Sequence, residues 1–108
     1  MSNIGRTVLR PERNIEPGKP FLVKTLVKHP QYNGIMKGDD GKPIPKDFIS
    51  TINVFYGSDL MFSIKASSSL SINPKLNFWL KVDRSDTLKV VWIDNKGNQA
   101  EEKVKLKL

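Results

Sequence analysis

The chain alternates apolar and polar residues in short runs, and turn-forming residues separate these runs. In the last run, QAEEKVKLKL at residues 99–108, Val104, Leu106 and Leu108 are apolar and the positions between them are lysines. A period of two sends alternate side chains to opposite faces of a β-strand. The pattern therefore predicts a strand with one face in a core and the other in water.

Several further runs have the same character, and Gly, Pro, Asp and Asn residues lie between them. The alternation places Phe48 on the same side as Ile52, and Leu60 on the same side as Phe62. A helical repeat is missing apart from at most one turn in residues 63–71. The spacing predicts an all-β fold, an immunoglobulin-like antiparallel β-sandwich of about seven strands. The runs predicted as strands are residues 21–29, 48–56, 60–64, 76–82, 87–94 and 99–108.

The length of 108 residues fits one domain, so residues 1–108 are expected to form a single unit with a partly irregular arm at residues 1–17. Residues 31–47 contain three glycines and two prolines and are expected to form a long irregular connection with a turn at GDDG. Connections of this length are unusual in small domains and often functional. No apolar run reaches the ~20 residues of a membrane span, and the first residues lack the apolar region of a signal peptide.

The chemistry available to the chain is narrow. It has one histidine, His29, and no cysteine, so it cannot build a typical zinc site or a thiol nucleophile. Asp39 and Asp40 in GDDG lack the ligand spacing of a calcium loop, and the serines of ASSSLS lie outside a Gly-x-Ser-x-Gly turn. We therefore expect no metal, no cofactor and no enzyme activity. A hydrolase that uses a serine with His29 is the weaker alternative.

The net charge of +7 suits an acidic partner, small anions or nucleic acid. The lysines of the last run alternate with apolar residues, which favours an ordinary solvated strand face over a nucleic-acid surface. Two aromatic residues, Phe55 and Trp79, fall on the side of their strands opposite the expected core. They indicate either a surface for a partner or a face that the 31–47 connection covers, and the sequence leaves both interpretations open.

The order of several segments resembles the SoxZ family of the sulfur-oxidation (Sox) system. The resemblance covers roughly residues 18–98, and the segments that carry it are KTLVKHP, GKPIPKDFI, FYGSDLMFSIKASSSLSINP, FWLKVD and VVWIDNKGN. The chain departs from the family pattern at Gln31 and Tyr32, which follow His29 and Pro30. The resemblance implies an immunoglobulin-like fold and a non-catalytic scaffold subunit that forms a heterodimer with SoxY, whose tail cysteine carries thiosulfate-derived sulfur.

The resemblance also implies transient contacts with other Sox enzymes and a periplasmic location reached by co-export with SoxY. From the lysine pattern and the short apolar runs, we expect no binding to nucleic acid or membranes. The sequence leaves open whether the isolated chain forms a homo-oligomer. For His29 we favour a structural corner, in which an imidazole nitrogen bonds a loop carbonyl, over a direct contact with the anionic cargo. The alternative function is a stand-alone basic β-sandwich that binds nucleic acid or another polyanion. The candidate interface residues are His29, Pro30, Phe55, Phe62, Asn73, Pro74 and Trp79.

Overall fold

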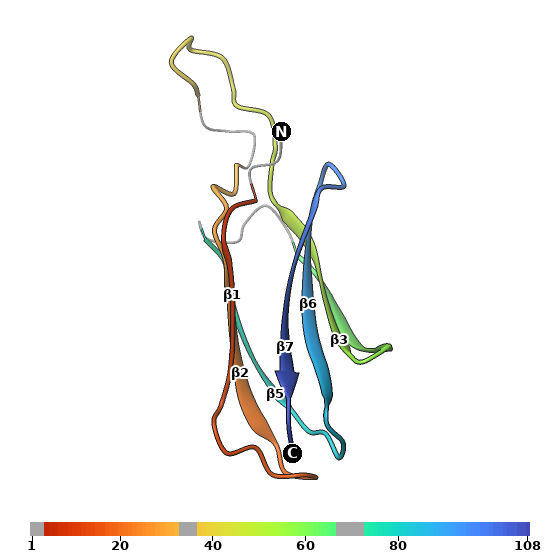
Figure 1. Ribbon diagram of the computed structural model, residues 1–108. Coiled ribbons are helices and arrows are strands. Elements are labelled where there is room, and N and C mark those ends of the chain that lie inside the picture. The colour runs from red at the N-terminus through yellow and green to blue at the C-terminus, as the bar shows by residue number, and fades with distance from the viewer. Residues whose placement is uncertain (1–3, 33–36, 67–72) are drawn as a thin grey trace.

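The computed structural model describes residues 4–32, 37–66 and 73–108, and these residues fold into two antiparallel sheets that face each other (Figure 1). One sheet has the strand order β1-β2-β5 and the other β4-β3-β6-β7. This arrangement confirms the predicted all-β sandwich. The strands of the described residues are β1 (Thr7–Pro11), β2 (Phe21–Val27), β3 (Ile49–Tyr56), β4 (Asp59–Lys65), β5 (Lys75–Leu80), β6 (Asp86–Asp94) and β7 (Gln99–Leu106).

The core lies between the sheets and is made by the alternate residues that the period of two selects. Leu88, Val90 and Trp92 of β6 are completely buried, because β6 lies in the interior of its sheet. Phe62 of β4 and Phe78 of β5 join the two sheets, with ring centroids 5.0 Å apart in an edge-to-face arrangement. None of the described residues forms a helix long and apolar enough to cross a membrane.

Strand β1 was not predicted. It pairs antiparallel with β2 over Thr7–Pro11, inside the arm that was expected to be partly irregular. The segment is short and contains an arginine and a proline, so its alternation is too weak to predict a strand from sequence. The Thr7 hydroxyl donates to Glu102 Oε2 at 2.6 Å, and this bond ties β1 to β7 at one edge of the sandwich.

Strand β3 contains two irregularities that shift its pattern. Its pairing with β6 slips between Ile49 and Thr51, so Ile49 is completely buried while Phe48 is half-buried, and the predicted core position of Phe48 is wrong. A bulge inserts one residue and moves the following side chains to the other face. A second slip against β4 follows Val54, and Leu60 is 55% exposed although it was grouped with Phe62.

The long connection leaves the sandwich at one end (Figure 1). Tyr32 and Asp47 close its base through two backbone hydrogen bonds, from Tyr32 N to Asp47 O at 2.8 Å and from Asp47 N to Tyr32 O at 2.9 Å. Its tip is a tight turn, as predicted for GDDG, in which Gly38 N donates to Lys42 O and Gly41 N donates to Gly38 O. The connection is therefore a side branch fixed at its base.

Candidate functional site

Four polar side chains meet in the interior where the long connection joins the sandwich. We call His29, Gln31, Asp47 and Asp94 the buried polar cluster, since each is at most 5% exposed. Strand β2 ends just before His29, β3 begins just after Asp47, and Asp94 is the last residue of β6. The chain ends of three strands thus converge, and ligand-type atoms of His29, Asp47 and Asp94 lie within 4.8 Å of one another.

The hydrogen bonds of His29 select one tautomer. Its Nδ1 accepts from the backbone N–H of Gln31 at 2.9 Å, so Nδ1 carries a lone pair and the proton of the neutral ring lies on Nε2. Nε2 lies 3.3 Å from Asp47 Oδ1. A structural corner was expected, but the expected bond from the imidazole to a loop carbonyl is wrong, because the ring accepts a loop N–H instead.

The chain turns sharply at Gln31. Its φ is +54°, a value that costs a non-glycine residue free energy and needs support from neighbouring bonds. Two hydrogen bonds give this support. The backbone N–H of Gln31 donates to His29 Nδ1, and its side-chain Oε1 accepts from Ile49 N at 2.8 Å. Sequence reasoning missed this role, because a glutamine in a loop has no distinctive pattern.

This arrangement does not suit general-base or metal chemistry. In the tautomer that the Gln31 contact selects, Nε2 holds a proton and Nδ1 is occupied, so His29 has no accessible lone pair for a hydroxyl or a metal ion. The oxygens of Asp94 accept from Lys96 N, Asn98 N and Asn98 Nδ2 at 2.8–3.0 Å, which uses this carboxylate to close the β6–β7 turn. The serines 67–69 and 71 of the hydrolase alternative lie outside the described residues.

A lysine at the surface partly offsets the charge of Asp47. Lys96 is half exposed, and its Nζ lies 3.7 Å from Asp47 Oδ2. Three buried donors, His29 Nε2, Gln31 Nε2 and Trp92 Nε1, have no hydrogen-bond partner among the described residues, although His29 Nε2 lies 3.3 Å from Asp47 Oδ1. The buried polar cluster therefore combines strong local bonds with some uncompensated polar burial, and its contacts fix the loop onto the core.

Asn73 and Pro74 continue this corner from the other side. His29 N donates to Asn73 Oδ1 at 2.9 Å, Asn73 N donates to His29 O at 2.8 Å, and Pro74 O accepts from Val27 N. Asn73 has a φ of +54°, which asparagine tolerates better than most residues. These candidate interface residues, with the half-buried Pro30 beside them, thus hold the end of β2 against the start of β5.

The three aromatic candidates have three different environments. Phe62 packs inside the sandwich on Phe78. Phe55 is half-buried on the outer face of the four-stranded sheet, where Lys89 Nζ lies 4.7 Å from its ring centroid. Trp79 is 64% exposed on the outer face of the three-stranded sheet, so no described part of the long connection covers it.

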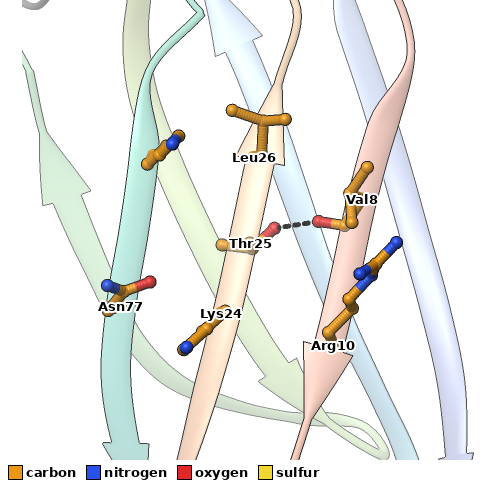
Figure 2. A pocket seen from close by; sticks show the side chains of 7 residues that line it. Val8, Arg10, Lys24, Thr25, Leu26 and Asn77 are labelled. Carbon is orange, nitrogen blue, oxygen red and sulfur yellow. Dashed lines mark hydrogen bonds between the residues drawn. The ribbon is translucent and has the colours of Figure 1, made fainter.

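Trp79 borders a shallow groove that crosses all three strands of its sheet. The groove has a volume of about 430 Å³, and Figure 2 shows Arg10 and Lys24 on neighbouring strands within it. Trp79 is the register partner of Leu22 on β2, two residues along from the Lys24–Asn77 pair and therefore on the same face of the sheet. We call the following outward residues of the groove the basic sheet face: Val8, Arg10, Lys24, Leu26, Lys75 and Asn77.

The opposite end of the sandwich also closes on a buried polar group. The Tyr56 hydroxyl donates to the carbonyl of Arg84, and burial raises the pKa of Tyr56, with a smaller contribution from the charge of Asp86. Arg84 Nη2 lies 2.8 Å from Asp59 Oδ2, and this hydrogen bond raises the pKa of the guanidinium. These contacts fix the β3–β4 and β5–β6 connections to each other.

Comparisons with known proteins agree on fold and identify a family. The family described as "Sulphur oxidation protein SoxZ" matches residues 9–105, nearly the whole chain. No curated protein matches the sequence. A variant of the superoxide reductase (neelaredoxin) from Ignicoccus hospitalis is similar in structure, with a TM-score of 0.70 and 13% identity over 97% of this chain and 81% of that one.

A hypothetical protein from Pyrococcus horikoshii OT3 is similar as well, with a TM-score of 0.61 and 18% identity over 98% of this chain and 90% of that one. At such low identity these structures establish a shared fold only. The match to the sulfur oxidation family is the comparison that bears on function.

Proposed function

The chain belongs to the SoxZ family of sulfur oxidation proteins, and from this membership we propose that it is the non-catalytic scaffold subunit of a sulfur carrier. In this proposal it binds SoxY in the periplasm, after co-export with it. SoxY supplies the tail cysteine that carries the sulfur, and the complex makes transient contacts with the other Sox enzymes. The chain supplies the surface that holds the partner and the basic charge around it.

The division of labour is supported by where the reactive groups lie. The chain has no cysteine, and its one imidazole is completely enclosed, with Nδ1 bonded to the Gln31 N–H and Nε2 facing Asp47 rather than solvent. Sulfur transfer needs an accessible thiolate or another nucleophile. The chemistry therefore comes from the partner, and this chain contributes adhesion.

The observation that carries the proposed binding role is the exposure of Trp79. A tryptophan that is 64% exposed on a regular strand leaves a large apolar surface in water. Tryptophan is also enriched among the residues that dominate binding energy at interfaces. Leu22, its cross-strand partner, extends this apolar surface on the same outer face.

Co-expression with SoxY, followed by light scattering of the purified sample, tests the proposal. We expect a heterodimer, and we expect Trp79→Ala to weaken its Kd by about tenfold or more, the effect of a side chain worth ~1.4 kcal/mol or more. Leu60→Ala is the matched control, since Leu60 is similarly exposed but lies on the other sheet. Separate monomers at micromolar concentration would refute the proposal.

Two measurements test the absence of catalysis and the location. The purified chain without SoxY is expected to turn over neither thiosulfate nor superoxide, and turnover of either would overturn the non-catalytic assignment. Fractionation of cells that express both subunits is expected to recover the chain with the periplasmic proteins only when the SoxY signal peptide is present.

A further inference from the structure

The basic sheet face carries three cations, and Glu12, the acidic residue two positions after Arg10, directs its carboxylate to Leu22 N. Arg10 and Lys24 are direct register partners on β1 and β2, and Lys75 is the register partner of Leu26. Like charges directly opposite each other on neighbouring strands destabilise a sheet. Among the described residues, no carboxylate forms an ion pair with any of these three cations, and none of those lining the groove is acidic.

The four-stranded sheet contains a similar pair of cations that is balanced. Lys89 and Lys103 are register partners on β6 and β7. However, Lys103 Nζ lies 3.7 Å from Glu101 Oε1, and Lys89 Nζ lies over the Phe55 ring. Repulsion between lysines is thus offset within that face, whereas neither Arg10 nor Lys24 has an ion pair or an aromatic ring contact among the described residues.

The apolar side chains of the groove determine what kind of polyanion fits it. Val8 and Leu26 are half-buried register partners, and Trp79 stands at the border of the groove. A nucleic-acid surface combines cations with stacking aromatics along the strand path, but here the residues between the cations are aliphatic. Aliphatic side chains flanked by cations complement a protein surface in which carboxylates surround an apolar residue.

We propose that the basic sheet face is a docking site for a protein partner that presents carboxylates around at least one apolar side chain. The inference rests on the proposed function and deepens it, because the partner expected there is the thiol-bearing subunit. The carboxylates neutralise Arg10, Lys24 and Lys75, while the apolar side chain covers Val8 and Leu26. Trp79 extends the contact beyond the groove.

Reversal of one charge on each sheet tests this site with a matched control. Lys24→Glu places a carboxylate opposite Arg10, and Lys103→Glu places one opposite Lys89, so both variants change the net charge equally. We expect Lys24→Glu to weaken binding to SoxY by about tenfold or more, and Lys103→Glu to change it by less than about threefold. The binding of the native chain should weaken with salt more steeply than that of Lys24→Glu.

Stability measurements separate docking from a structural role. Because Lys24→Glu replaces a repulsive pair by an attractive one, its urea midpoint is expected to stay equal or rise while binding falls. A lower midpoint that accounts for the lost binding would overturn the inference. Equal binding by the native chain and Lys24→Glu would overturn it too, but would leave the proposed scaffold function intact.

A soluble peptide of alternating Glu and Leu tests the same chemistry without SoxY. If the native chain binds this peptide but not SoxY, and Lys24→Glu abolishes the binding, the docking chemistry stands and the proposed function fails. If the face binds a labelled oligonucleotide and neither SoxY nor the peptide, both proposals are overturned. A chain that binds none of the three probes overturns both as well.

Discussion

The buried polar cluster and the basic sheet face use polar residues in opposite ways. In the cluster, His29 and Asp94 are enclosed, and their side chains accept hydrogen bonds from the backbone. These bonds hold the loop and the strands together. On the face, Arg10 and Lys24 are exposed, and neither forms an ion pair within the part of the chain that the structure describes. The difference teaches that residue types with reactive potential can be structural, while an ordinary strand surface can carry the function.

Loss of His29 is expected to have the largest effect on stability. His29→Ala removes the acceptor for Gln31 N–H and leaves a cavity beside Asp47, so it should lower the free energy of unfolding by about 3 kcal/mol. His29→Phe fills the space but offers no acceptor for the Gln31 N–H, so it should lower the free energy of unfolding by about 2 kcal/mol. Urea unfolding followed by circular dichroism measures both. A loss below about 1 kcal/mol for His29→Ala would show that the cluster is not a structural corner.

Asn73 is expected to have a smaller effect, which can be divided into two parts. Asn73→Gly removes the acceptor for His29 N–H but tolerates the positive φ, and should cost about 1 kcal/mol. Asn73→Ala removes the acceptor and adds left-handed strain, so it should cost about 2 kcal/mol. The same unfolding assay distinguishes them. Equal stability of all three chains, combined with weaker SoxY binding by both variants, would move Asn73 from the corner to the interface.

Tyr56 tests whether polar burial at the other end of the sandwich behaves like the cluster. Tyr56→Phe should cost about 1 kcal/mol at neutral pH, because the Arg84 carbonyl loses its donor. The pKa of folded Tyr56 is raised, so the folded state holds the proton more tightly than the unfolded state. The stability advantage of the native chain over Tyr56→Phe is therefore complete below pH ~10 and shrinks as the pH rises further. A constant difference across alkaline pH would contradict this assignment.

Trp79 should have the smallest effect on folding. Trp79→Ala is expected to change the free energy of unfolding by less than about 0.5 kcal/mol, since the side chain is largely in water already. If Trp79→Ala lowered the free energy of unfolding as much as His29→Ala, the proposed contrast between the buried polar cluster and the basic sheet face would be wrong. Thermal unfolding of the two variants side by side checks this contrast.

Much of the fold was accessible from the alternation of the sequence, and the exposed position of Trp79 followed from the same parity. The bulges of β3 could not be predicted, because a bulge depends on how two strands pair and has no distinctive pattern in the sequence of one strand. The sequence predicted a structural corner at His29, but not that the imidazole is enclosed. Its partners Gln31 and Asp47 were not predicted either, since only the closed base of the long connection brings them together.

The two-bond closure between Tyr32 and Asp47 has a practical consequence. Besides that closure, Asn95 Nδ2 donates to Lys46 O at 3.1 Å, and at the far turn Gly41 has no neighbouring atom within 4 Å of an added Cβ. Lengthening a side branch at its tip costs little chain entropy and leaves the two hydrogen bonds between Tyr32 and Asp47 unchanged. The turn between Asp40 and Gly41 is thus a suitable place to graft an epitope or a dye-binding tag.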